Sequence, residues 1–381
     1  MIFLDHAATT PVRREALEAM WPFLSGSFGN PSSHHALGDE ASRALAAARA
    51  TVAAVVGCRP GDVVFTSGGT EADNLAVKGL ALANPRGRHL VVSPIEHEAV
   101  LESAAFLARV HGFEVSEVAV DEGGLVTPEA LAEVIRPDTA LVSVQLANNE
   151  IGTVQPVADL AAVAHAAGAL VHTDAVQAAG WLPLSLDALG VDALSLAGHK
   201  VGAPKGTGAL IVRGRLQLEP VLHGGGQERG RRSGTENVAG AVAFATALRL
   251  AEAERADAAA RVAALGAAFT ATIAATVPGA QPTGAPEHRL PGTVSFVFPG
   301  TSGEAVLLEL ERDGIVCSSG SACAAGSDEA SHVLTALGLP AELAQTAVRF
   351  TLGAENTTEE LADAAASVAR AVSAVRGIVA T

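Results

Sequence analysis

The sequence predicts an α/β protein whose main sheet is mostly parallel and covered by helices on both faces, with a smaller α+β domain at the C-terminus. Short β-rich runs alternate with Ala-rich helical stretches from about Cys58 to Arg213. These runs are apolar on both faces, which is typical of buried parallel strands. A long Ala-rich run from about Val238 to Thr276 then predicts one helix that separates the two parts.

Six runs are the predicted strands of the main sheet. The stretches between them are rich in alanine, which has the highest helix propensity, and are therefore expected to be helices. Sheets of this kind bind ligands beyond the carboxyl ends of their strands. The predicted strands are residues 62–66, 89–92, 113–115, 139–144, 169–172 and 193–196.

The remainder of the chain predicts a second domain. A Gly- and Arg-rich segment, 223–237, ends the alternation, and the long helix after it is expected to join the two domains. From about Pro291 the pattern predicts strands, a loop around Cys323 and then helices, the last over about 358–375. The expected large domain is 15–255, and the expected small domain is 1–14 with 256–381.

Composition limits the function classes. The formal net charge of −16 over 381 residues disfavours nucleic acid or an anionic membrane as the main partner. Residues 1–6 (MIFLDH) show no basic region followed by an apolar one, so we expect no secretory signal, and we read no apolar run as long and clean enough to cross a bilayer. Three cysteines make no disulfide framework and no metal-ligand spacing appears, so we expect no resident metal. A soluble protein in a reducing, cytoplasmic setting is expected.

Lys200 is the first candidate for chemistry. The sequence contains only Lys78, Lys200 and Lys205, and Lys200 follows a predicted strand through the turn residues Gly198 and His199. A lysine there can be desolvated, lose its proton near neutral pH and attack a carbonyl, as a Schiff-base enzyme requires. The alternative is a lysine that snorkels at the strand end.

Two other strand ends carry residues that suit a cofactor. Residues 66–74 (TSGGTEADN) follow a strand and open a helix, so they form either a phosphate cradle or an ordinary turn. Asp174 follows another strand, where an acid often merely caps a helix. An acid at one strand end and Lys200 at the next is the pairing that pyridoxal phosphate requires, with the acid on the ring nitrogen and the amine on the aldehyde.

Cys323 is the candidate nucleophile. Small residues flank it in 318–327 (SSGSACAAGS), a composition that suits a moving loop better than a packed core. Only a few per cent of an ordinary thiol is thiolate at pH 7, so a general acid or base is expected nearby. Cys317 ends a predicted strand and is interpreted as packing, and Cys58, in a turn, is given no role.

His97 and Arg349 are the remaining candidates drawn from the residues themselves. His97 follows a strand, where proton transfer or ring stacking competes with a structural role. Arg349 interrupts an apolar strand, 347–351, and is costly there unless it is paired. Its partner is either a substrate carboxylate or an internal Asp or Glu.

Taken together, these residues resemble the pyridoxal phosphate-dependent cysteine desulfurases of the NifS/IscS type, in the class V aminotransferase group. Several motifs in the right order make a far more specific match than any one of them. The resemblance implies the fold-type-I architecture of pyridoxal phosphate-dependent transferases, and the longer segment around Cys323 looks like the group I branch. The motifs are 4–11 (LDHAATTP), 28–34 (FGNPSSH), 69–71 (GTE), 148–152 (NNEIG), 198–200 (GHK), 232–237 (RSGTEN) and the Cys323 segment.

The resemblance implies a role for each candidate. Lys200 would form the Schiff base and remove the Cα proton, His97 would stack on the ring and shuttle protons, and Cys323 would be the nucleophile. Cys323 is also a candidate transient iron–sulfur ligand. The implied cofactor contacts are Asp174 to the ring nitrogen, Gln177 to the ring hydroxyl, Gly69, Thr70 and His199 to the phosphate, Asn149 beside the cofactor, and Thr235 from a second subunit. The implied substrate contacts are Asn30, Asn149 and Arg349.

The resemblance also implies an activity and partners. A homodimer would convert L-cysteine to L-alanine and pass the sulfur to an acceptor such as an iron–sulfur scaffold or a thiolation enzyme. A selenocysteine lyase or an aminotransferase is the second alternative, but an aminotransferase needs no loop cysteine. A cofactor-free scaffold is the third, and the intact Lys200, Asp174 and Cys323 weigh against it.

Several positions depart from the family pattern. Ala197 stands where relatives usually place a serine that helps hold the phosphate, so somewhat weaker cofactor affinity is expected. Gly202 and Ala203 differ from the pattern common after the lysine, with no expected effect on the chemistry. Ala324 and Ala325 replace more polar residues, a change that bears on partner docking.

Overall fold

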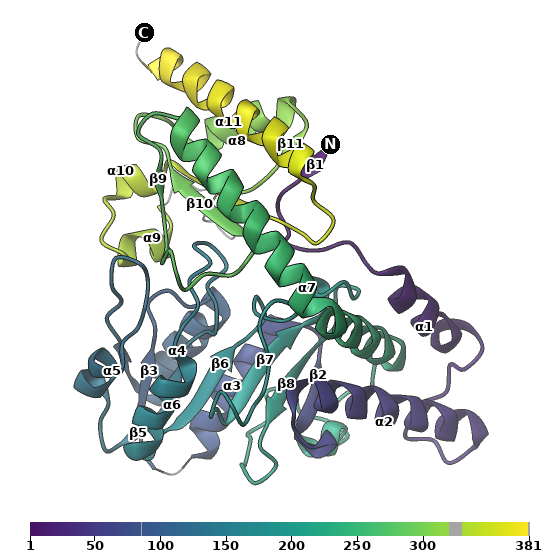
Figure 1. Cartoon of the computed structure of the whole chain (residues 1–381). Helices are drawn as coiled ribbons and strands as arrows, with labels where there is room; N and C mark the ends of the chain where they lie inside the picture. The colour runs from purple at the N-terminus through teal and green to yellow at the C-terminus, as the bar shows by residue number, and fades with distance from the viewer. Residues whose placement is uncertain (85, 320–329, 380–381) are drawn as a thin grey trace.

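A computed structural model describes residues 1–84, 86–319 and 330–379 of the chain (Figure 1). The strands are β1 (Ile2–Phe3), β2 (Val63–Thr66), β3 (His89–Val92), β4 (Glu114–Glu117), β5 (Thr139–Ser143), β6 (Leu170–Asp174), β7 (Ala193–Ala197), β8 (Gly208–Val212), β9 (Gln281–Pro282), β10 (Thr293–Val297), β11 (Ile315–Val316) and β12 (Ala347–Thr351). The helices are α1 (Arg14–Ser25), α2 (Ala36–Val56), α3 (Gly69–Ala83), α4 (Glu98–His111), α5 (Pro128–Val134), α6 (Val157–Ala166), α7 (Val238–Thr276), α8 (Gly303–Arg312), α9 (His332–Ala336), α10 (Ala341–Ala344) and α11 (Thr358–Val379), with 3₁₀ turns at Pro60–Asp62, Gly198–Lys200 and Glu228–Gly230.

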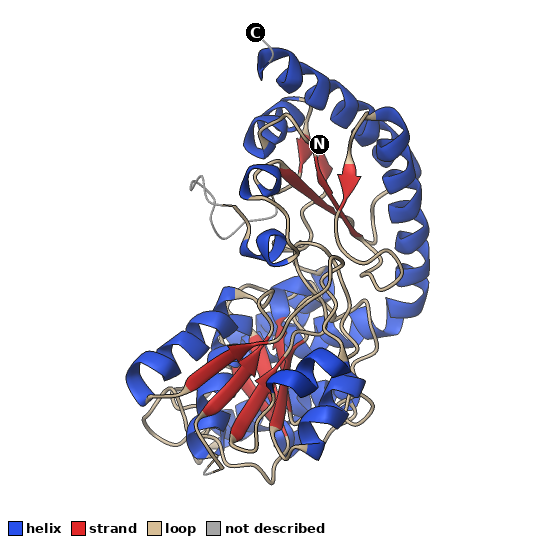
Figure 2. Cartoon of the chain, turned by 90° about the vertical axis from the view of Figure 1, so that its left-hand side faces the viewer, coloured by secondary structure: helices blue, strands red, loops and turns tan. Residues whose placement is uncertain are grey.

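The main sheet has seven strands in the order β2-β8-β7-β6-β5-β3-β4. The five strands from β7 to β4 in this order run parallel, and β8 lies antiparallel between β2 and β7. Helices cover both faces of the sheet (Figure 2). The predicted α/β class with a mostly parallel sheet is therefore confirmed.

All six predicted strands of the main sheet form, within two residues of their predicted bounds. β8 was not predicted, although Gly208–Val212 (GALIV) is an apolar run of the same kind. Its direction has a simple cause. The connection 198–207 between β7 and β8 contains only a 3₁₀ turn, and a parallel crossover needs a dozen or more residues.

The N-terminus and the C-terminal third together form a second body, called here the C-terminal body, which consists of β1, β9–β12 and α8–α11. β10 lies antiparallel between β9 and β12, and β1 pairs in parallel with β11. Its core, which includes Leu4, Phe296 and Phe350, is distinct from the core around the main sheet. The last predicted helix forms as α11, whereas α8 was not predicted. The domain boundaries 15–255 and 1–14 with 256–381 stay a prediction.

α7 joins the two bodies, and its bounds match the predicted long helix (Figure 1). Phe244 and Leu248 in its first half pack into the main core, and Phe269 in its second half packs into the core of the C-terminal body. One continuous helix therefore contributes to both cores.

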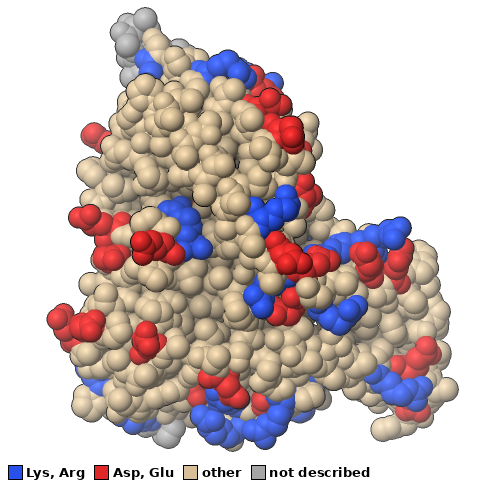
Figure 3. Space-filling model, in the orientation of Figure 1, with Lys and Arg blue, Asp and Glu red and all other residues tan. Residues whose placement is uncertain are grey.

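Among the described residues, α7 is also the one helix long and apolar enough to cross a membrane by length and composition. The expectation that no run meets this test was wrong, because a stretch of 18 residues within α7 has few charges and a mean hydropathy of 1.5. In the view of Figure 1, the upper part of the molecule shows mainly uncharged side chains (Figure 3). Length and composition are weak evidence alone, since core helices of globular proteins pass the same test.

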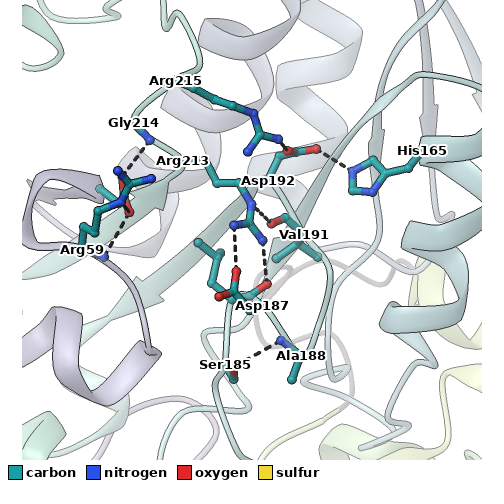
Figure 4. A network of polar contacts seen from close by, with 12 residues as sticks. Arg59, His165, Ser185, Asp187, Ala188, Val191, Asp192, Arg213, Gly214 and Arg215 are labelled. Carbon is teal, nitrogen blue, oxygen red and sulfur yellow. Dashed lines mark hydrogen bonds and ion pairs between the residues drawn. The ribbon is translucent and has the colours of Figure 1, made fainter.

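A polar network lies at the edge of the main sheet opposite the carboxyl ends of the parallel strands (Figure 4). Its centre is Asp192, which directly precedes β7 and is buried. The Asp192 carboxylate accepts hydrogen bonds from the Val171 N–H at 3.1 Å and from Arg215 Nη2 at 3.0 Å. His165 Nε2 lies 2.8 Å from the same carboxylate. The network therefore ties β6, β7 and α6 together far from the predicted site.

Replacing Asp192 with alanine is expected to lower the free energy of unfolding by about 2–3 kcal/mol, because the Val171 N–H loses its buried acceptor. Urea unfolding followed by circular dichroism measures this change. Asp187→Ala is the matched control, since the Asp187 side chain in the same network is 75% exposed and its pair with Arg213 is worth at most about 1 kcal/mol. Equal losses in both variants would contradict the central place of Asp192.

Candidate active site

Nine of the predicted site residues line one cavity of about 310 Å³. It lies at the carboxyl ends of β6 and β7 and at the start of α3, as expected for a sheet of this type. The segment between β1 and α1 and strand β12 of the C-terminal body also contribute to its wall. The nine residues are Gly69, Thr70, His97, Asn149, Asp174, Gln177, His199, Lys200 and Arg349.

Lys200 lies in the 3₁₀ turn that directly follows β7. Its side chain is half-buried, and Nζ donates hydrogen bonds to the backbone carbonyl of Ala7 and, at 2.9 Å, to that of Ala8. Two carbonyls of the N-terminal segment thus hold the amine at the cavity wall instead of in bulk water. This placement suits an amine that joins a bound carbonyl group.

Asp174 ends β6 and is buried. Its Oδ1 accepts a hydrogen bond from the Val176 N–H at 2.8 Å. Burial raises the pKa of Asp174, while nearby His97 and Lys200 favour its charged form. Because burial disfavours the charged form, a cationic partner would stabilise the carboxylate, and a protonated pyridine nitrogen is such a partner.

Another wall of the cavity suits a phosphate. No side chain within the described part of the chain caps the N-terminus of α3, so its first backbone N–H groups remain for an anion. A Cβ on Gly69 would lie 2.8 Å from Cγ2 of Val176, so glycine keeps this space open. An amine, a buried acid and an anion cradle in one cavity fit pyridoxal phosphate.

His199 belongs to the phosphate wall as a neutral side chain. Its Nδ1 lies 3.2 Å from Oγ1 of Thr9. Burial, assisted by Lys200 and Lys205, lowers the pKa of His199 to about 4. At neutral pH His199 would therefore contact a phosphate through a hydrogen bond and not through a positive charge.

His97 and Gln177 complete the cofactor side. His97 precedes α4 and caps it, because its Nδ1 accepts a hydrogen bond from the Ala99 N–H at 3.1 Å. Capping uses one ring nitrogen and leaves Nε2 for a ligand, so the structural and the chemical interpretation of His97 are compatible. Gln177 Nε2 donates to the carbonyl of Ala7 at 3.0 Å.

Arg349 lies in β12, and only 1% of it is exposed. Its Nη2 donates to Oδ1 of Asp5 at 2.8 Å, and its Nη1 donates to the backbone carbonyl of Asn149 at 2.9 Å. The sequence left either a substrate carboxylate or an internal Asp or Glu as the partner of Arg349, and in the structure Asp5 is an internal partner. Nothing in the local pattern around Asp5 relates it to a residue 344 positions later.

Two buried acids near Asp174 were not predicted. Asp73, on α3, lines the cavity, and Glu96, in the segment between β3 and α4, accepts the Gln145 N–H at 2.8 Å. One carboxyl oxygen of each has no hydrogen-bond partner among residues 1–84, 86–319 and 330–379. Burial, together with nearby Asp174, raises the pKa of Asp73 and of Glu96 well above the ordinary range. Both environments therefore favour the neutral acid.

The raised pKa of Glu96 predicts a pH-dependent loss of stability. Above its ordinary pKa of 4.5, the unfolded chain has released this proton while the folded chain keeps it, so stability falls as pH rises. The slope is about 1.4 kcal/mol per pH unit for one group. Glu96→Gln is expected to remove this slope between about pH 5 and the folded pKa, as measured by urea unfolding at a series of pH values. Glu98→Gln, at an exposed neighbouring position, should leave the slope unchanged.

Two predicted site residues, Asn30 and Thr235, lie elsewhere in the described part of the chain. Asn30 is exposed before α2, where its Oδ1 accepts the Ser32 N–H at 2.9 Å. Thr235 is exposed and lines a separate hollow with Arg232. Cys323 lies outside the described residues. The structure thus does not bring Asn30 or Thr235 to the cavity of their own chain, and Thr235 was expected to act across a dimer. In the described part of the chain, no group of three or more His, Cys, Asp or Glu side chains could hold a metal ion.

Known proteins similar to this chain agree with the cavity chemistry. Residues 2–363 match the family model of class V aminotransferases. The chain is 44% identical over 361 residues to the cysteine desulfurase IscS of Dictyoglomus turgidum. The alignment covers 94% of this chain and 91% of the relative. It is also 44% identical over 361 residues to the cysteine desulfurase IscS of Methanosarcina thermophila, covering 94% of this chain and 89% of the relative.

Solved structures give the same result. A NifS-like protein superposes with a TM-score of 0.91 at 38% identity, covering 98% of this chain and 99% of that chain. A NifS-like protein from Rickettsia africae superposes with a TM-score of 0.86 at 29% identity, covering 97% and 99%. The resemblance drawn from the motifs is therefore confirmed over nearly the whole length. The chain belongs to the class V aminotransferase family and, within it, to the cysteine desulfurases of the IscS and NifS type.

Proposed function

We propose that this protein converts L-cysteine to L-alanine and passes the sulfur, as a persulfide on Cys323, to an acceptor protein. One observation carries the proposal: Lys200, Asp174 and Arg349 line a single cavity in a chain of the cysteine desulfurase family. An amine, a buried acid and a guanidinium are the groups that an amino acid and its aldehyde cofactor require.

Enzymes of this family depend on pyridoxal phosphate, which supplies an aldehyde that joins amines and a protonated ring that takes up electrons. The chemistry of each cavity residue indicates which part of pyridoxal phosphate it would contact. Gly69, Thr70 and His199 would hold the phosphate, Asp174 the ring nitrogen and Gln177 the ring hydroxyl. Because His199 is neutral at pH 7, the α3 N-terminus and not His199 would contribute positive potential at the phosphate.

The remaining residues would act on the substrate. Arg349, with Asn149 beside it, would bind the α-carboxylate of cysteine and so place its Cα near Lys200. Lys200 would accept the Cα proton and return it, and His97, which lines the same cavity, would also move protons. The Cys323 thiolate would attack the substrate sulfur, so that an S–S bond forms as the Cβ–S bond breaks. The electron pair of the broken bond would stay on the carbon skeleton, which takes up a proton and leaves as alanine.

The test is product analysis with purified protein, pyridoxal phosphate and L-cysteine. The expected result is one alanine for each persulfide sulfur, released as sulfide by a thiol reductant. Selenocysteine and an amino acid–keto acid pair are assayed in parallel. Preferred turnover of selenocysteine would identify a selenocysteine lyase, and transamination would identify an aminotransferase. Failure to form alanine from cysteine would contradict the proposal.

The acceptor is proposed only by class, as an iron–sulfur scaffold or a thiolation enzyme. A mixed disulfide trapped on Cys323 in cells of the native host would identify it. We also propose a reducing, cytoplasmic setting, which the free thiols of Cys58 and Cys317 support. Cell fractionation with an antibody to the protein tests this location.

We further propose that the protein is a homodimer. Large apolar side chains are exposed on and after α1, among them Trp21 at 66% and Phe28 at 68%. The exposed Leu17, Trp21 and Leu24 lie three or four residues apart on α1 and so share one face, and clustered exposed apolar side chains mark interaction surfaces. A second copy that covers them would also give the exposed Thr235 a partner cavity to reach. Light scattering is expected to give twice the 38.3 kDa chain mass, and a monomer at all concentrations would contradict the dimer.

A further inference from the structure

The guanidinium of Arg349 is held from two segments that are far apart in the sequence. Nη2 donates to Asp5 Oδ1 at 2.8 Å, and Nη1 donates to the Asn149 carbonyl at 2.9 Å. The Arg349 side chain is 2% exposed and that of Asp5 18%. A buried guanidinium without an anion is costly, so Asp5 supplies the charge that makes this position of Arg349 tolerable.

The two contacts leave part of the guanidinium unused. Its five N–H donors have a fixed planar arrangement, so holding two of them also fixes the directions of the others. Nε is buried and has no hydrogen-bond partner within the described residues. Because Arg349 lines the cavity together with Lys200, a carboxylate that binds the remaining donors would place its amino acid beside the amine.

Asp5 itself is placed by backbone pairing and not by the cavity. Directly before it, β1 pairs with β11, and the Leu4 N–H donates to the Val316 carbonyl at 2.7 Å. Asp5 forms a parallel bridge with Thr351, at the end of the strand that carries Arg349. Asp5 is not among the cavity-lining residues. Its carboxylate is therefore preorganised against Arg349 and can act on a ligand only through it.

We propose that Asp5 is a positioning residue that orients Arg349 for the α-carboxylate of the amino acid substrate. This inference rests on the proposed function, in which Arg349 binds that carboxylate. Asp5 then determines how well the site distinguishes an amino acid from an amine that lacks the carboxylate, and it has no part in the chemical steps.

Two substitutions separate orientation from charge. Asp5→Ala removes the acceptor, and the KM for L-cysteine is expected to rise about 10- to 100-fold, the effect of losing a hydrogen bond to a charged group. The kcat at saturation should change less than about 3-fold, because the lost interaction acts equally on the bound substrate and the transition state. Asp5→Asn keeps an acceptor oxygen in the same place, and its KM should stay within about 5-fold of that of the unchanged protein.

A ligand without a carboxylate gives the second readout. 2-Aminoethanethiol has the amine and thiol of cysteine but no carboxylate, and its binding to the cofactor-loaded enzyme is followed by the change in cofactor absorbance. Its affinity should be the same in the unchanged protein, Asp5→Ala and Asp5→Asn. An equal loss of affinity for cysteine and 2-aminoethanethiol would mean general damage and would overturn the proposal, as would an unchanged KM in Asp5→Ala.

Arg349→Gln distinguishes failure of this inference from failure of the proposed function. If Arg349→Gln raises the KM for L-cysteine and Asp5→Ala does not, only the role of Asp5 is wrong. If neither variant changes it, the assignment of the carboxylate to Arg349 is wrong as well. If Asp5→Ala does not fold, Asp5→Glu moves the carboxylate by one methylene. It should raise the KM with little change in kcat, and an unchanged KM in Asp5→Glu would overturn the proposal.

Discussion

Replacing Lys200 with alanine is expected to reduce turnover by about four orders of magnitude, the upper range for a positioned proton-transfer group. Of the three lysines in the sequence, Lys200 is the one that lines the cavity. The Ala7 and Ala8 carbonyls hold its amine there, and the other two lysines do not line the cavity. Turnover is measured as alanine formed from L-cysteine.

The same variant gives a readout that does not depend on activity. Borohydride treatment of the unchanged protein with cofactor should attach a pyridoxyl group to Lys200, and mass spectrometry of the peptide should find none in Lys200→Ala. Lys205→Ala is the matched control, because Lys205 is exposed five residues later and should retain both the label and the activity. A pyridoxyl group on another side chain of Lys200→Ala, with turnover near that of the unchanged protein, would refute the assignment.

Replacing Cys323 with serine is expected to lower the rates of persulfide and sulfide formation at least about 100-fold. The reason is that a serine hydroxyl is a far weaker nucleophile than a thiolate at neutral pH. Cofactor binding should be unchanged, since the substitution alters none of the cavity residues proposed to hold the cofactor, among them Thr70, Asp174 and Lys200. The cofactor absorbance of the purified variant measures the first property, and sulfide release in the presence of a thiol reductant measures the second.

The other two cysteines provide the control. Burial, with Asp62 and Asp187 nearby, raises the pKa of Cys58 to about 11, and burial together with Asp5 raises the pKa of Cys317 above the ordinary range. Neither thiol is ionised at neutral pH, so Cys58→Ser and Cys317→Ser should retain sulfur transfer. Continued desulfuration by Cys323→Ser, or its loss in Cys317→Ser alone, would show that the nucleophile was assigned to the wrong residue.

Local patterns in the sequence were enough for most of the main sheet and for most of the cavity. A parallel strand buried on both faces needs an unbroken apolar run, and this requirement holds for β3, β5, β6 and β7. β4 at the sheet edge is mostly exposed and β2 pairs antiparallel with β8, although both were also predicted within two residues. Since the carboxyl ends of such strands meet at one edge, residues directly after them come together without any knowledge of the packing. Asp174, Lys200 and His97 were found in this way, and the motif resemblance added Gly69, Thr70 and Gln177.

Contacts between distant segments were decided only by the tertiary structure. The pairing of β1 with β11 brings Asp5 to Arg349 and the carbonyl of Ala7 to Lys200, and no local period relates positions so far apart. Asp73 and Glu96 were missed because a buried acid and an exposed acid look alike in a sequence. Asn30 and Thr235 show the converse, since motif residues can lie outside the cavity of their own chain. Periodicity determines which face of an element is buried, whereas the neighbours on that face depend on how the elements pack.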